Sequence, residues 1–212
     1  MDIYAERLEN LNASMTVFSW MSRAVDYPTE ELLEGLFRGE FIQNLPDEKA
    51  KAIKAYMDTF DSADELLLDL QKDYTRMCFV SKPRLVPLFE SVYKEGKLYQ
   101  DSTFEIARLY DDAGIKLGKE FKLPPDHITL ELEFMSYLIY QELEAIKNGN
   151  KDHEEMALRL QKETMAKHLG QFGLDLADRL CQHAKTPFYQ GMGDVLKDFL
   201  QFELQQDQGL ES

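Results

Sequence analysis

An aspartate and a histidine stand where a proline-rich turn becomes a helix, at Asp126 and His127. Asp126 follows two prolines, and an aspartate in that place is a strong N-cap because its carboxylate accepts backbone N–H bonds and is stabilised by the helix dipole. His127 would then occupy the first helical position, exposed or half-buried. A capping carboxylate can also present an oxygen to an arginine, so Asp126 could cap the helix and bind a ligand at the same time.

Glu131 lies four residues after His127, so both side chains lie on one face of the predicted helix. This pair could ligate a metal ion, but no third or fourth ligand follows at a recognised spacing. Glu133 points away from Glu131, because two helical steps turn a side chain by about 200°. The sequence also has no P-loop, no dinucleotide-binding glycine motif and no G-x-S-x-G elbow. We therefore expect a recognition site without a cofactor rather than an active site.

A second segment, residues 82–93, is rich in proline and apolar side chains. Pro83 and Pro87 each restrict the backbone and remove an N–H donor, which lowers the ordering cost when a peptide binds alongside. Glu90 and Tyr93 would offer that peptide a carboxylate and an amphipathic ring. In the alternative interpretation the segment is a packed loop, and Glu90 is salt-bridged internally. Both interpretations are open at this point.

Helical periodicity runs through the chain and predicts an all-α fold of about eight to ten helices, with no strand pattern. Capping boxes at residues 62–65 and 102–105 mark helix starts, as do Pro46 and Pro187. The sequence Asn148-Gly149-Asn150 marks a helix end. The predicted helices cover about residues 4–25, 30–37, 46–60, 62–78, 102–114, 126–147, 152–183 (bent at Gly170 or Gly173) and 187–204.

These helices are expected to form one domain over residues 1–205, followed by a polar, frayed tail over 206–212, since 212 residues suffice to bury one core. The domain would divide into an N-terminal half, about 1–114, and a C-terminal half, about 126–205, with a cleft between them. The connector, residues 115–125, could act as a hinge for exchanging halves, so we expect a monomer with some dimer.

Composition restricts the classes of function. A formal net charge of −15 argues against nucleic-acid binding, because phosphate contacts need clustered Lys and Arg. Cys78 and Cys181 have no metal-ligand spacing and are expected to be buried free thiols. The first residues lack the basic start and apolar core of a signal peptide, and no apolar run approaches the roughly 20 residues that span a bilayer. We expect a cytoplasmic protein without stable membrane insertion.

Two motifs carry a family resemblance: P-R-L-V-P-L-F-E-S-V-Y over residues 83–93 and P-P-D-H-I-T-L-E-L-E-F-M over residues 124–135. Together they resemble the TorD/DmsD/NarJ family of redox enzyme maturation chaperones. The segment from Tyr74 to Phe79 is similar to the family's Tyr-x-x-Leu-Phe helix end, with Cys78 in place of leucine. The sequence from His168 to Phe172 is similar to the family's His-Leu-x-x-Trp. The resemblance runs from about residue 8 to residue 200.

The resemblance implies a TorD-like fold and a chaperone, not an enzyme. The implied partner is the apo form of a molybdenum or tungsten oxidoreductase with its twin-arginine leader peptide, held for cofactor insertion before export or assembly. The leader would lie as an apolar segment in a groove between helices. Cys78 and Phe172 depart from the family pattern in ways that affect client specificity more than fold. The alternatives are a helical metal- or nucleotide-dependent enzyme centred on His127 and Glu131, or an unrelated helical adaptor. The predicted peptide-binding residues are Asp126, His127, Glu131, Pro83, Pro87, Glu90, Tyr93, Phe79 and Tyr74.

Overall fold

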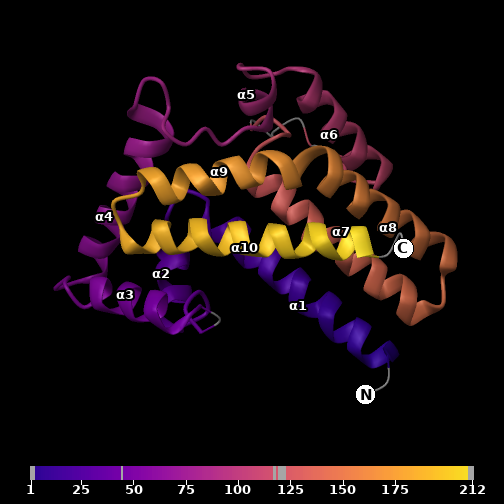
Figure 1. Ribbon diagram of the computed structural model, residues 1–212, viewed down its shortest axis with the longest axis horizontal. Coiled ribbons are helices and arrows are strands. Elements are labelled where there is room, and N and C mark those ends of the chain that lie inside the picture. The colour runs from indigo at the N-terminus through magenta and orange to yellow at the C-terminus, as the bar shows by residue number, and fades with distance from the viewer. Residues whose placement is uncertain (1–2, 44, 117, 119–122, 210–212) are drawn as a thin grey trace. The chain divides into compact units, whose positions relative to one another are not determined.

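Helices make up nearly all of the regular structure in the computed structural model, which describes residues 3–43, 45–116, 118 and 123–209. No strand occurs in this part of the chain, so the all-α prediction is confirmed. The α-helices, labelled in Figure 1, are α1 (Ile3–Ala24), α2 (Glu30–Phe37), α3 (Asp47–Met57), α4 (Ala63–Thr75), α5 (Glu90–Lys94), α6 (Asp101–Asp112), α7 (Ile128–Asn148), α8 (Lys151–Thr164), α9 (Gly170–His183) and α10 (Pro187–Gly209). Two π-helical turns, η1 (Arg76–Val80) and η2 (Met165–Leu169), continue α4 and α8.

The chain divides into two compact units, each built from segments that are distant in sequence. Unit 1 contains Met1–Ser22, Phe89–Phe172 and Glu203–Ser212, and unit 2 contains Arg23–Leu88 and Gly173–Phe202. The helices α1, α9 and α10 therefore contribute residues to both units. Residues 117 and 119–122 of the predicted hinge at 115–125 lie outside the described residues. The division into halves at this connector, with a cleft between them, stays a prediction.

In unit 1, α7 and α8 form a helical hairpin whose turn follows the predicted chemistry. Gly149 adopts a left-handed conformation with φ of 65°, and its N–H caps the end of α7 at Ala145 and Ile146. The side chain of Asn150 then accepts the N–H of His153 and caps α8. The two helices pack against each other. Buried apolar residues of both helices lie in the core, among them Leu132, Phe134, Leu138, Ala157 and Leu160.

In unit 2, the helix start predicted at residues 62–65 is confirmed. The hydroxyl of Ser62 accepts the N–H of Glu65 at 3.3 Å, and the Glu65 carboxylate accepts the N–H of Asp61 at 3.3 Å. The core of this unit centres on the buried Tyr74, whose ring lies 5.7 Å from that of Tyr27 and 5.8 Å from that of Tyr189.

Three helix boundaries differ from the prediction. The short α5 lies inside the segment expected to be a loop. The capping box at residues 102–105 does not form; instead the Glu95 carboxylate accepts the N–H and hydroxyl of Ser102 at 3.2 and 3.0 Å, so an acceptor outside the helix caps α6. The last helix continues through the predicted polar tail to Gly209, because Gln and Glu are good helix formers; residues 210–212 lie outside the described residues.

The long helix predicted over residues 152–183 is interrupted at η2. A Cβ atom at Gly170 would lie 2.3 Å from the carbonyl oxygen of Met165, closer than any real Cβ contact. The N–H of Gly170 donates to that same oxygen, which is the wide hydrogen bond of a π-helical turn. Glycine is therefore required where the π-turn ends, and the turn determines the direction of the side chains that it carries.

Candidate functional site

The two segments singled out in the sequence meet in unit 1. Phe89 and His127 form an isolated antiparallel bridge, and the N–H of Glu90 donates to the carbonyl of Asp126 at 2.9 Å. The N–H of Ser91 donates to Asp126 Oδ2, also at 2.9 Å. The rings of Phe89 and His127 lie 5.0 Å apart in an edge-to-face arrangement. We call Phe89–Ser91 together with Asp126–His127 the clip.

The capping prediction for Asp126 is wrong for α7. His127 is the N-cap of that helix, and its Nδ1 accepts the N–H of Thr129 at 3.3 Å and lies 2.7 Å from the Thr129 hydroxyl. The Asp126 carboxylate instead accepts an N–H in the first turn of α5, a helix that the sequence did not predict. His127 is also only 4% exposed, not exposed or half-buried as expected.

Three carboxylates of this region, those of Glu90, Asp126 and Glu131, have 0% exposed surface. Glu90 lies beside two basic groups: the Nδ1 of His168, at 3.0 and 3.1 Å from its two oxygens, and the Nζ of Lys94, at 2.5 Å. Of the two interpretations left open for Glu90, the structure shows the internally paired one. Burial of charge without such partners would destabilise the fold, so this pairing is needed.

Glu131 has no such pairing. Neither of its oxygens has a hydrogen-bond partner among the described residues, and neither has Asp126 Oδ1. Burial raises the pKa of Glu131 well above its usual range, the neighbouring Glu90 and Asp126 carboxylates raise it further, and Lys94 offsets part of the effect. The neutral, protonated form of Glu131 is therefore favoured in the folded protein.

Tyr110, on α6, completes the surroundings of the clip. Its hydroxyl donates to the carbonyl of Pro125 at 2.9 Å, directly before Asp126. Its ring lies 4.6 Å from that of Phe134 on α7. Burial, together with the nearby Glu131, Asp126 and Glu90 carboxylates, raises the pKa of Tyr110, so its hydroxyl stays a donor.

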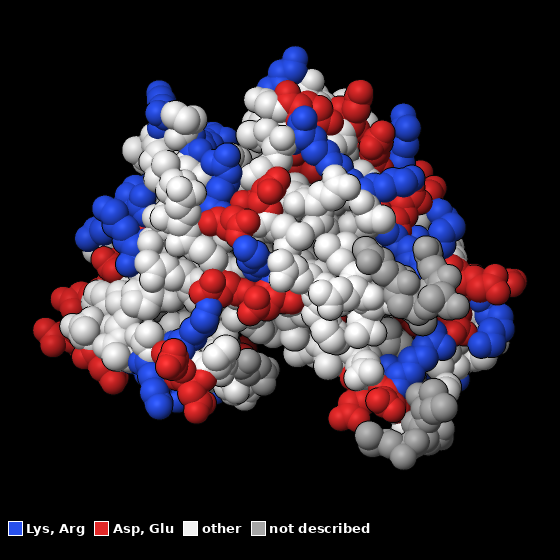
Figure 2. Space-filling model, viewed as in Figure 1, with Lys and Arg blue, Asp and Glu red and all other residues white. Residues whose placement is uncertain are grey.

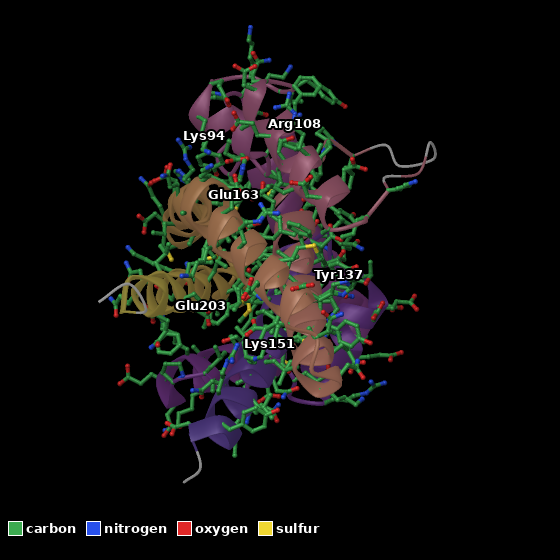
Figure 3. The ribbon with its side chains drawn as sticks, turned by 90° about the vertical axis from the view of Figure 1, so that its right-hand side faces the viewer. Lys94, Arg108, Tyr137, Lys151, Glu163 and Glu203 are labelled. Atoms are coloured by element: carbon green, nitrogen blue, oxygen red, sulfur yellow. The ribbon has the colours of Figure 1, made fainter. Side chains whose placement is uncertain are left out.

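The sequence interpretation missed His168 and Lys94. His168 is 2% exposed and lies against Glu90, a residue 78 positions away. Its one sequence signal is the His-Leu pair of the family motif. Lys94 lies one helical turn after Glu90, projects from α5 (Figure 3) and also donates to the carbonyl of Lys167 on η2.

The other predicted site residues do not all lie at the clip. Tyr93 belongs to unit 1, where its half-buried ring lies 5.8 Å from that of Phe172. Tyr74, Phe79, Pro83 and Pro87 belong to unit 2. Of these four, Tyr74 and Pro87 are buried, Pro83 is exposed and the Phe79 ring is 51% exposed.

Unit 2 also contains a cavity of about 260 Å³ that holds none of the predicted site residues. Its lining residues are Tyr56, Asp69, Lys72, Asp73, Arg76, Lys185, Thr186 and Pro187. Asp73 Oδ2 accepts the N–H groups of Lys185 and Thr186 at 2.8 and 2.9 Å, and Oδ1 accepts from Arg76 at 2.6 Å. Asp73 is therefore occupied by the backbone just before α10 and by an ion pair, and the second acidic residue of the lining, Asp69, accepts the hydroxyl of Tyr56 at 2.7 Å.

The potential metal ligands and the two cysteine thiols of the described residues are not arranged for metal binding or nucleophilic attack. Within the described ranges, no group of three or more His, Cys, Asp or Glu side chains is placed to hold a metal ion. Burial raises the thiol pKa of Cys78 to about 12 and that of Cys181 to about 11, so both are poor nucleophiles. Cys78 is buried as predicted, but Cys181 is partly exposed, which corrects that prediction.

Comparison with known proteins gives consistent results. The family model described as "Nitrate reductase delta subunit" matches residues 42–178. Chaperone protein TorD of Photobacterium profundum is 32% identical over 97 residues, which is 44% of each protein. Chaperone protein TorD of Vibrio parahaemolyticus is 25% identical over 175 residues, covering 81% of this chain and 77% of the relative.

Among solved structures, the fold is similar to that of a putative redox enzyme maturation protein from Archaeoglobus fulgidus. The TM-score is 0.57 at 22% identity, covering 88% of this chain and 93% of that one. The solved structure thus shares the all-helical fold of this chain, and the two curated relatives are named as chaperone proteins. The chain belongs to the nitrate reductase delta subunit family, which confirms the resemblance to TorD and NarJ found in the sequence.

Proposed function

We propose that this protein is a chaperone for the maturation of a redox enzyme. Its client is the apo form of a molybdenum or tungsten oxidoreductase, which it holds through the leader peptide, in the cytoplasm, until the cofactor is inserted and the client is exported or assembled. Family membership supports this function, as do two relatives named chaperone protein TorD. No described helix is long and apolar enough to cross a membrane.

The clip is the observation that carries the proposal. It joins the two motifs of the family resemblance through two backbone N–H groups, a carboxylate and a ring contact. Because the Asp126 carboxylate of the clip and the neighbouring Glu131 carboxylate have no exposed surface, we assign both the role of holding this part of unit 1 in shape. On unit 2, direct contact with the leader falls to exposed side chains of the predicted set, above all Phe79.

The chemistry of such a leader fits these side chains. Burying an apolar leader residue against an exposed aromatic ring contributes about 1.5–3 kcal/mol before ordering costs are subtracted. The net charge of −15 favours a basic peptide, although salt screens this attraction beyond about 8 Å. Figure 2 shows acidic and basic side chains interspersed over the face in view, so this face does not carry one large patch of a single charge. We propose a monomer with some dimer as the working form.

Replacing Phe79 with alanine is expected to weaken leader binding by about 1–2 kcal/mol and to lower the melting temperature modestly, because the ring is 51% exposed and its centroid lies 5.8 Å from that of the buried Tyr74 ring. The probe is a synthetic peptide with two consecutive arginines followed by an apolar segment, titrated by calorimetry. Phe104→Ala is the matched control, since Phe104 is 57% exposed on α6 and belongs to neither motif. Equal affinities of wild type and Phe79→Ala would contradict this assignment.

A further inference from the structure

The side chain of His168 lies on the π-helical turn η2, where an ordinary α-helix would point it elsewhere. The turn requires glycine at position 170, as the 2.3 Å approach of a Cβ to the Met165 carbonyl oxygen shows. The imidazole of His168 contacts a different helix: its Nδ1 lies 3.0 and 3.1 Å from the two Glu90 carboxylate oxygens on α5. The chain thus adopts a rare backbone geometry at the residue that connects η2 to the clip.

α5 depends on such connections. It has five residues, too few for a helix to be stable on its own hydrogen bonds. Two side-chain links join it to η2: His168 to Glu90, and Lys94 to the carbonyl of Lys167. Glu90 and Ser91 are also the residues whose N–H groups bind Asp126. Any movement of Glu90 is therefore transmitted to the backbone of the Asp126–His127 segment.

Several buried oxygens of the clip and of Glu131 lack a partner in the part of the chain that the structure describes. Ser91 Oγ, Asp126 Oδ1 and both carboxylate oxygens of Glu131 have no hydrogen bond among the described residues. Most buried polar groups in proteins are hydrogen-bonded, so such a concentration of exceptions is typical of a site kept for function. The charged and titratable groups near Glu90 include His168, Lys94, Asp126, Glu131 and Tyr110.

We propose that His168 is a positioning residue for client binding: through Glu90 it holds the Phe89–Ser91 and Asp126–His127 segments in register, and this register sets the shape of the leader-binding surface. The inference rests on the proposed function. It assigns to the His-Leu motif a role at the clip, 78 residues away from Glu90 along the chain. His168 is buried, so it acts through Glu90 and does not touch the client.

The test compares His168→Ala, His168→Gln and His153→Ala by amide hydrogen exchange and by calorimetric titration with the same leader peptide. His153 is the control because it is exposed on α8. His168→Ala should speed exchange at the Glu90 and Ser91 amides by about tenfold, the factor that follows from losing the net contribution of one hydrogen bond. Exchange within the α7–α8 hairpin should change little, and leader affinity should fall. His168→Gln keeps an N–H donor. Its exchange rates at Glu90 and Ser91 and its leader affinity should therefore lie close to those of wild type.

Three outcomes would overturn the role of His168. They are unchanged exchange at Glu90 and Ser91, a uniform rise of exchange throughout unit 1, and unchanged leader affinity despite a released clip. Failure of the wild-type protein to bind the leader would instead overturn the proposed function. In that event the exchange data would still decide whether His168 holds the clip.

Discussion

Glu90→Ala should lower the free energy of unfolding of unit 1 by about 3 kcal/mol, because it leaves the buried His168 and the partly buried Lys94 without their shared carboxylate and opens a small cavity. Trp20 is the single tryptophan of the chain and lies buried in unit 1, so its fluorescence during urea denaturation measures this change.

Glu144→Ala provides the control for Glu90→Ala. Glu144 pairs with Lys147 one turn along α7. The Lys147 side chain is 73% exposed and that of Glu144 is 40% exposed, so loss of this pair should cost less than about 0.5 kcal/mol. If the two variants lose the same small amount, the Glu90 pairing contributes no more than a surface ion pair and the clip is not held in the way described.

Glu131→Gln should make the protein more stable than wild type at neutral pH. The pKa of Glu131 is raised in the folded state, so above its unfolded pKa, about 4.3, the folded protein binds one proton more than the unfolded chain. Stability associated with the neutral carboxyl is fully present below that pH and is lost as pH rises toward the folded pKa. Wild type should therefore lose about 1.4 kcal/mol relative to Glu131→Gln for each pH unit in that interval.

The measurement for Glu131 is a series of urea titrations between pH 4 and pH 8 on both proteins. Glu155→Gln, at an exposed position on α8, should follow the wild-type profile. A difference between Glu131→Gln and wild type that stays constant with pH would show that Glu131 ionises normally, and so that it is not a buried neutral acid.

Much of the fold could be predicted because the signals are local. Ser62, Gly149 and Pro187 mark helix ends by their own conformational preferences, and each end lies within a residue or two of the prediction. The sequence singled out both motifs, and the structure joins them at Phe89 and His127.

What could not be predicted depends on contacts between distant residues. Whether Asp126 or His127 caps α7 is decided by α5, which offers Asp126 another N–H to accept. The Glu90–His168 contact has no local spacing, since it needs the η2 turn to direct the imidazole. The sequence around Glu131 also does not show that its carboxylate is fully buried. Helical periodicity predicts which face of the helix carries a side chain, but not what packs against that face.

The proposed function predicts direct binding of a leader peptide by the wild-type protein. The measurement is calorimetric titration of the full-length protein with the synthetic twin-arginine peptide, beside a peptide of the same composition in scrambled order. We expect saturable binding of one leader per chain and much weaker binding of the scrambled peptide. Equal binding of the two peptides, or no binding of either, would contradict it.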